Sequence, residues 1–101
     1  MLQLTTINFK SETARGVMVV DFWAEWCGPC RALAPAFEAV SGELKKIAFA
    51  KVNVDEEREL AQEHGVMSIP CLIVFKHGKE VDRLVGNMSK ESLKQKLGKW
   101  V

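Results

Sequence analysis

Residues 17–30 read VMVVDFWAEWCGPC, an apolar, β-branched run followed by a Cys-x-x-Cys pair. The near-continuous apolar character of Val17–Trp23 predicts a central strand that is buried on both faces of a sheet. Beyond Cys30, apolar side chains recur every three or four residues, which predicts a helix with one buried face. They are Leu33, Phe37, Val40 and Leu44. The stretch therefore predicts a strand that runs directly into a helix, with two cysteines at the junction.

The two cysteines form a candidate redox centre. Thiols at this spacing can close a small disulfide ring, and Cys27 lies in the first helical turn, where free N–H groups and the helix dipole stabilise a thiolate. Gly28 permits the close approach of another backbone, and Pro29 suits a first turn because its missing N–H costs nothing there. Pro35 is expected to bend the helix without ending it, since the apolar stripe resumes beyond it. Three cysteines are too few for a disulfide framework, so the pair is expected to be reactive.

The composition is that of one small globular domain. The 101 residues are 48% apolar and 27% charged, and they can bury a single core. A formal net charge of +1 gives no electrostatic attraction to nucleic acid or to a membrane surface, so neither is an expected partner. Residues 1–6 lack the charged start and long apolar stretch of a secretory signal. We expect a single domain over residues 1–101, a cytoplasmic location and a monomer.

Four further strands are predicted, the last two antiparallel because a short turn joins them. They are Leu2–Thr5, Ile47–Val54, Cys71–Phe75 and Glu80–Val85. Three further helices are predicted from capping residues. Asn8 caps a short helix that ends near Arg15, Asp55 caps a helix over Glu56–His64, and Ser89 caps the last one. The order βαβαβαββα predicts a mixed sheet between layers of helices.

Three segments of the chain resemble the thioredoxin family, and the likeness extends over nearly the whole sequence. The segments are Val20–Cys30, Ser68–Pro70 and Phe75–Gly78. The resemblance implies the thioredoxin fold, an α/β arrangement with a central mixed sheet of about five strands flanked by four helices. It also implies a general protein-disulfide reductase. The Gly-Pro pair between the cysteines resembles that of reducing members of the superfamily, whereas oxidising and isomerising members usually carry His in the second of these positions.

In such a reductase each cysteine has its own role. Cys27 attacks a substrate disulfide as a thiolate, and Cys30 then attacks the Cys27 sulfur and releases the reduced substrate. Asp21 is a carboxylate in a buried strand, so its pKa should be raised and it is placed to accept the proton of Cys30. The buried Asp of the thioredoxin family lies at the matching position. The alternative is an Asp21 side chain that points to solvent or satisfies a helix end.

Lys51, the charged residue within the second buried strand, is the expected partner of Asp21 and also matches the family. The alternative for Lys51 is a side chain that only extends its amine to the surface.

The resemblance further predicts a substrate-binding surface. Thioredoxins hold the proline that corresponds to Pro70 in the cis form beside the cysteine pair, and the backbone of the residue before it pairs with extended substrate. A flat apolar collar around Cys27 is then expected. It comprises Trp26, Gly28, Pro29, Met67, Ile69, Pro70, Val85 and Gly86. Met67 and Val85 could instead be core residues, and Trp23 is expected to pack beneath the site.

Cys71 departs from the family, which usually has Thr directly after this proline. We favour a small, buried and inert residue, because free cysteines are commonly buried. The sharper hypothesis is a regulatory thiol that is glutathionylated or that competes for disulfide formation.

No bound cofactor is expected, because the electrons are stored in Cys27 and Cys30. The resemblance implies recharging by a thioredoxin reductase, with NADPH and FAD belonging to that partner. It also implies disulfide-containing clients such as ribonucleotide reductase, peroxiredoxin and methionine sulfoxide reductase.

Three alternatives to the reductase are considered. A zinc site completed by Cys71, His64 or His77 is disfavoured because a second Cys-x-x-Cys is missing, so no metal is expected. An oxidase or isomerase would use the same fold and cysteines, and it would differ in how strongly the disulfide is favoured. A non-catalytic binding module would need neither the two cysteines nor Asp21 and Pro70.

Overall fold

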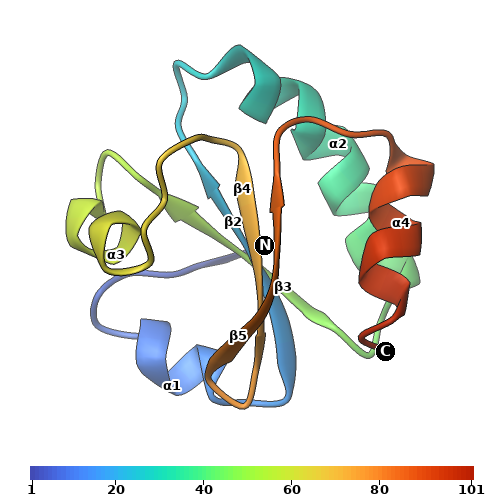
Figure 1. Ribbon diagram of the computed structural model, residues 1–101, viewed down its shortest axis with the longest axis horizontal. Helices are drawn as coiled ribbons and strands as arrows, with labels where there is room; N and C mark the ends of the chain where they lie inside the picture. The colour runs from blue at the N-terminus through green and yellow to red at the C-terminus, as the bar shows by residue number, and fades with distance from the viewer.

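A five-stranded mixed sheet separates two pairs of helices in the computed structural model, which describes residues 1–101 (Figure 1). The strand order is β1-β3-β2-β4-β5; β1, β3 and β2 are parallel, and β4 is antiparallel to both of its neighbours. The strands are β1 Leu2–Gln3, β2 Val17–Trp23, β3 Ala48–Asn53, β4 Cys71–Lys76 and β5 Lys79–Val85. The helices are α1 Phe9–Thr13, α2 Gly28–Glu43, α3 Arg58–Glu63 and α4 Lys90–Gly98. The predicted fold class and order of elements are confirmed.

The central strand β2 pairs with β3 along one edge and with β4 along the other. Successive side chains of a strand point to opposite faces of the sheet. Val20 and Phe22 enter the core that also contains residues of α1 and α3, whereas Val19 enters the core lined by α2 and α4. Because both faces are covered, the strand is apolar at every position except Asp21 and does not alternate between apolar and polar residues.

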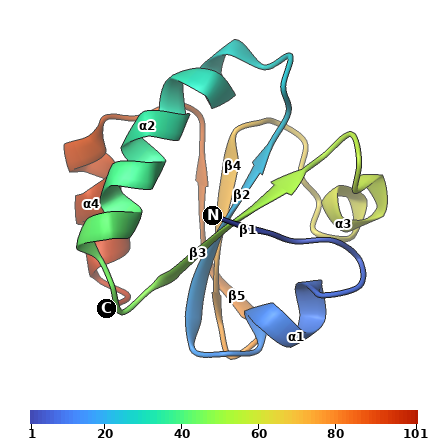
Figure 2. The same cartoon turned by 180° about the vertical axis from the view of Figure 1, so that it is seen from behind.

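Two hydrophobic cores lie on opposite faces of this sheet. Figures 1 and 2 show α1 and α3 on one side and α2 and α4 on the other. The first core takes Phe9 from α1 and Leu60 from α3, and the second takes Phe37 from α2 and Leu93 from α4. None of these helices combines the length and the apolar character needed to cross a membrane.

Three connections meet at one end of the sheet, the upper end in Figure 1. They are the β2–α2 turn with Cys27, the segment that enters β4 at Pro70, and the β5–α4 connection that starts at Gly86. The strand register brings them together: Cys71 at the start of β4 lies opposite both Phe22 of β2 and Val85 of β5. Residues far apart in the sequence therefore share one surface.

Helix α2 follows its prediction closely. It runs from Gly28 to Glu43 without interruption at Pro35, which is exposed. The predicted apolar face is confirmed, because Leu33, Phe37 and Val40 are all buried.

Asn8 occupies the predicted N-cap position of α1, but its side chain does not cap the helix, and the predicted cap at Asp55 is wrong. The first strand ends at Gln3 and is shorter than expected. The Asn8 side chain accepts a hydrogen bond from the Thr5 backbone N–H at 2.7 Å rather than from an N–H of α1. Asp55 does not cap α3, which begins at Arg58 and has no side-chain cap. Short polar side chains near a helix start can hydrogen-bond to other local or tertiary groups, and Asn8 and Asp55 do so in place of capping a helix.

The cap at Ser89 is confirmed. Its Oγ accepts a hydrogen bond from the Ser92 N–H at 3.1 Å and satisfies one of the free donors at the start of α4.

Phe37 provides a test of the core beneath α2 and α4. It is fully buried, and its ring meets Phe49 nearly edge-on with 5.2 Å between centroids. Phe37→Ala should lower the free energy of unfolding by about 3–5 kcal/mol, because a cavity replaces the ring. Urea denaturation measures this loss. The control Ile7→Ala, at a side chain that is 93% exposed, should change stability by less than about 0.5 kcal/mol. Equal stability of the two variants would contradict this core.

Candidate active site

Cys27 and Cys30 form a disulfide at the start of α2, with their Cα atoms 5.2 Å apart. Cys27 occupies the N-cap position, and its Sγ accepts a hydrogen bond from the Cys30 backbone N–H at 3.2 Å. Both cysteines are buried. After reduction, a thiolate on Cys27 would sit at the positive end of the helix dipole with an N–H donor already in place. The predicted position of the pair at the strand–helix junction is confirmed.

The loop before Cys27 is fixed by three contacts. The Cys27 N–H donates to the Ala24 carbonyl at 3.2 Å, and the Arg31 guanidinium donates to the Glu25 carbonyl. The Trp26 indole N–H donates to the Asp55 carboxylate at 2.9 Å. These contacts hold the exposed Trp26 ring beside the cysteine pair.

Sequence reasoning missed the anchoring roles of Arg31 and Asp55. A signal for Asp55 depends on the pairing of β2 with β3, which the sequence analysis did not predict. In the parallel β2–β3 pair Trp23 lies opposite Asn53, so the segments that follow both strands leave the sheet at the same edge.

The segment before β4 lies against the disulfide. The Ile69–Pro70 peptide bond is cis, as the family resemblance implied. The Ile69 carbonyl oxygen is 3.8 Å from Cys27 Sγ, and Ile69 packs against the small cluster formed by the two cysteines and Ala24. The Pro70 carbonyl accepts a hydrogen bond from the Gly86 N–H at 2.9 Å, which joins this segment to the end of β5.

The residues expected to form the collar are placed unequally. Trp26, Met67 and Val85 are 68%, 93% and 56% exposed. Met67 and Val85 are therefore not core residues. Gly28 and Pro29 are also exposed, Ile69 and Gly86 are half-buried, and Pro70 is buried. Trp23 packs against the cysteine cluster from below, and its indole N–H is buried without a partner.

Asp21 is buried in β2 and neither carboxylate oxygen has a hydrogen-bond partner. Burial raises its pKa from 3.8 to about 7, and the charge of Lys51 offsets part of this effect. The alternative in which Asp21 points to solvent or satisfies a helix end is therefore excluded.

Lys51 lies opposite Asp21 in the β2–β3 register, but its amine sits over the Trp23 ring, 4.6 Å from the centroid. Its influence on Asp21 is electrostatic and does not involve a hydrogen bond.

Cys71 is fully packed between strands. It is 1% exposed and has no disulfide partner. Burial raises the pKa of its thiol, which opposes formation of the reactive thiolate. These observations favour an inert packing residue over a regulatory thiol.

His64, one of the alternative zinc ligands, is engaged elsewhere. The His64 ring packs against Phe9, Phe22 and Phe75, and its Nδ1 is 2.9 Å from the Leu60 carbonyl oxygen. No group of three or more His, Cys, Asp or Glu side chains is arranged to hold a metal ion.

Comparison with known proteins places this site in a family. A family model described as Thioredoxin matches residues 1–99. The chain belongs to the thioredoxin family. The thioredoxin of Chlamydia caviae is 50% identical over 86 residues, 85% of this chain and 84% of that protein. The thioredoxin of Bacillus subtilis is 43% identical over 100 residues, 98% of this chain and 96% of that protein. A solved structure of Plasmodium falciparum thioredoxin shares 37% identity, with a TM-score of 0.94 and complete coverage of both chains.

Membership in the thioredoxin family defines the class of chemistry. The chain is a dithiol–disulfide oxidoreductase, and Cys27–Cys30 is its redox-active disulfide. In thioredoxins this pair carries the electrons without a bound cofactor.

The raised pKa of Asp21 predicts an unusual pH dependence of stability. Between pH 3.8 and about 7 the folded chain keeps a proton that the unfolded chain releases, so stability falls as pH rises through this window. Asp21→Asn removes this penalty. Its gain in stability should be larger at pH 8 than at pH 4 by on the order of 4 kcal/mol, because three pKa units separate the two states.

Urea unfolding of both proteins at the two pH values measures this difference. The control Glu38→Gln, at an exposed position of α2, should show no comparable pH-dependent gain. A gain for Asp21→Asn that is equal at both pH values would contradict the raised pKa.

Alkylation tests the packing of Cys71. Iodoacetamide should leave Cys71 unmodified in the native, oxidised protein, because the folded chain shields the thiol from solvent. Once urea unfolds the chain, Cys71 should react fully. Peptide mass analysis assigns the modified residue. Rapid modification of the native protein would instead favour the regulatory thiol.

Proposed function

We propose that this chain is a general reductase of protein disulfides. One observation carries the proposal, namely the position of Cys27 Sγ between two backbone groups. The Cys30 N–H, 3.2 Å away, supports a thiolate, and the Ile69 carbonyl, 3.8 Å away, belongs to a segment suited to pair with extended substrate. The Gly28-Pro29 pair further favours reduction over oxidation, by resemblance to reducing members of the superfamily.

The proposed reaction proceeds through one mixed disulfide. The Cys27 thiolate attacks a substrate disulfide, forming a bond between Cys27 Sγ and one substrate sulfur and releasing the other as a thiolate. Cys30 then attacks Cys27 Sγ, which forms the protein disulfide and releases the second substrate sulfur. Two protons end on the substrate thiols. The protein dithiol is oxidised to the disulfide, and the substrate disulfide is reduced to two thiols.

Asp21 is proposed to take the proton of Cys30 before the second attack. A base works best when its pKa lies near the operating pH, and burial raises the pKa of Asp21 to about 7. Lys51 is proposed to limit this rise through its nearby charge, so that Asp21 can still ionise near neutral pH.

Substrate is proposed to bind across the collar. The exposed Trp26, Met67 and Val85 offer apolar contact, and the Ile69 backbone offers hydrogen bonds in the manner of strand addition. Backbone pairing demands few particular side chains, which suits a reductase with many clients. Gly28 and Pro29 leave room for the partner next to Cys27.

The proposed partners are a thioredoxin reductase, which supplies electrons from NADPH through its own FAD, and disulfide-containing clients. By family resemblance these clients include ribonucleotide reductase, peroxiredoxin and methionine sulfoxide reductase. A dithiol that must be kept reduced suits the cytoplasm, where thiols are maintained in that state. We propose that the chain acts there as a monomer.

Serine variants test the two cysteine roles. Cys30→Ser should accumulate a covalent complex with insulin, because the mixed disulfide on Cys27 can form but cannot be resolved. Cys27→Ser should form no complex and lose reductase activity. Non-reducing electrophoresis and turbidity from insulin reduction measure these outcomes. Trapping by Cys27→Ser instead of Cys30→Ser would reverse the assignment. A wild-type pair that is more easily reduced than glutathione disulfide would favour the oxidase or isomerase.

Replacing Asp21 tests its proposed role in proton transfer. Asp21→Asn should slow the resolution of the mixed disulfide by about tenfold or more near pH 7, because Cys30 loses its base. The loss should shrink toward pH 9, where solvent deprotonates Cys30. Stopped-flow measurement of substrate release from pH 6 to pH 9 gives the profile. An unchanged rate over this range would remove Asp21 from the reaction.

A further inference from the structure

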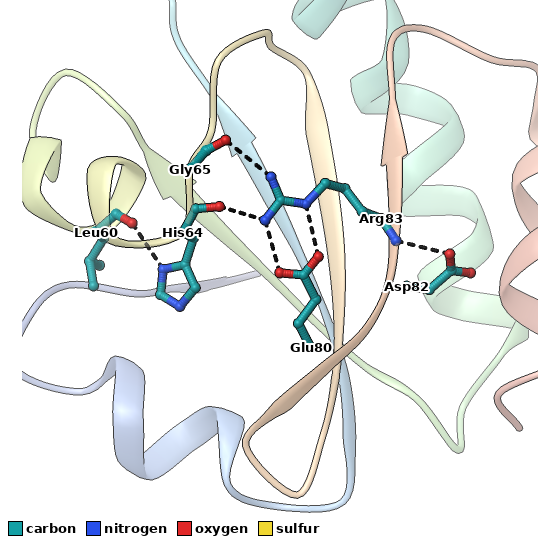
Figure 3. Close-up of polar contacts among 6 residues, drawn as sticks. All are labelled: Leu60, His64, Gly65, Glu80, Asp82 and Arg83. Carbon is teal, nitrogen blue, oxygen red and sulfur yellow. Dashed lines mark hydrogen bonds and ion pairs between the residues drawn. The ribbon is translucent and has the colours of Figure 1, made fainter.

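Arg83 on β5 reaches across to the end of α3 and binds it through the guanidinium (Figure 3). Nη2 donates to the His64 carbonyl, and Nη1 donates to the Gly65 carbonyl at 3.2 Å. Nε and Nη2 also donate to the two carboxylate oxygens of Glu80, at 2.9 Å and 2.8 Å. Two N–H groups thus bind Glu80 and one binds each carbonyl, so four of the five guanidinium N–H groups are used.

These contacts satisfy groups that a helix leaves free. The last carbonyls of a helix lack intrahelical partners, and a cation is favourable at that end. Gly65 turns the chain with a φ of +62°, and its carbonyl lies within reach of Arg83. Glu80 holds the guanidinium in its plane by a bidentate pair, which limits the rotamers of the long arginine side chain.

The segment that leaves this helix end is the one beside the disulfide. Five residues, Val66–Pro70, connect Gly65 to β4. Its first N–H donates to the Ala61 carbonyl at 2.9 Å, and its last carbonyl accepts from the Gly86 N–H at 2.9 Å. Between these ends, Met67 and Ser68 are exposed.

Strand β5 and the residue that follows it therefore hold the segment at both of its ends. Arg83 binds the chain where the segment begins, and Gly86 binds it where the segment ends. The Ile69 carbonyl near Cys27 lies between these anchors. A displacement of Gly65 would shift the Ile69 carbonyl, which is only four residues further along the chain. Small errors in position slow a reaction between two groups, here Cys27 and a substrate disulfide bound at Ile69.

We propose that Arg83 is a positioning residue that fixes segment 66–70, and thereby the Ile69 backbone, for the binding of extended protein disulfides. This inference rests on the proposed reductase function and adds a determinant of its substrate class. A protein disulfide pairs with the Ile69 backbone and depends on its position. A small aromatic disulfide needs only Cys27 and does not.

Two substrates separate positioning from a general loss of structure. Arg83→Met should reduce kcat/KM for insulin by about three- to tenfold, mainly through a higher KM. The rate at which the reduced protein reacts with 5,5′-dithiobis(2-nitrobenzoate) should stay within about twofold of wild type, because Cys27 itself is unchanged. Arg15→Met, at an exposed arginine in the turn between α1 and β2, is the matched control and should change neither rate.

Two further variants grade the effect. Arg83→Lys keeps the charge but loses the fork that binds both carbonyls, so it should restore only part of the insulin activity. Glu80→Gln keeps Arg83 but weakens the pair that orients its guanidinium, so it should lower kcat/KM for insulin by less than Arg83→Met does. Equal losses for both substrates, or no loss in Arg83→Met, would overturn the proposal.

Hydrogen exchange supplies a readout that does not depend on activity. The Val66 amide, which donates to the Ala61 carbonyl where the segment begins, should exchange faster in Arg83→Met than in wild type, while the amides of β4 should not. Unchanged exchange in the segment would overturn the positioning role. A wild-type chain that fails to reduce insulin would overturn the proposed function, and the exchange data would still decide whether Arg83 fixes the segment.

Discussion

The burial of β2 between the two layers of helices is the constraint on which the rest of the structure depends. This strand is paired along both edges and covered on both faces, so it fixes the positions of β3, β4 and both helical layers. Its end also sets where α2 begins, and therefore where the disulfide lies. The same burial brings an unpaired carboxylate into the interior at Asp21. The strand that positions the other elements of the fold therefore also contains its most costly buried group, the Asp21 carboxylate.

A strand that both organises the core and carries a buried carboxylate shows how stability and chemistry are balanced. An apolar residue at Asp21 would suit the core better, since a buried carboxylate without hydrogen bonds opposes folding. Retaining the carboxylate costs stability near neutral pH, yet it places a titratable group in the strand that leads to the cysteines. The large cores on both sides of the sheet offset that cost. Such local conflicts between foldability and chemistry are expected at functional sites.

Most of the fold could be read from the sequence because its signals are local and strong. The apolar run of β2, the periodic face of α2 and the cap at Ser89 each specify structure within a few residues. The side-chain partners of Asn8 and Asp55 were mispredicted, because they depend on how the chain folds around these two residues. Asp55 in particular meets Trp26, 29 residues away, and no local pattern reports such a contact.

The candidate site divides in the same way. The cysteines and Pro70 could be recognised from motifs, and the burial of Asp21 followed from the strand that contains it. The exposure of Met67 and Val85 could not be decided in advance, because the apolar neighbour of each, Val66 or Leu84, packs against a core. Arg83 gave no signal at all, since its carbonyl partners carry no side-chain identity.

The meeting of Cys27 with Ile69 has a consequence for the order in which the chain becomes functional. The two residues are 42 positions apart, and the contact requires β4 to be paired with β2. During synthesis both thiols leave the ribosome well before the strand that completes their surroundings. A nascent chain therefore carries exposed cysteines with no surface to select a partner, and selectivity arises only when the second half of the sheet docks. The reducing state of the compartment in which synthesis takes place must protect the pair until then.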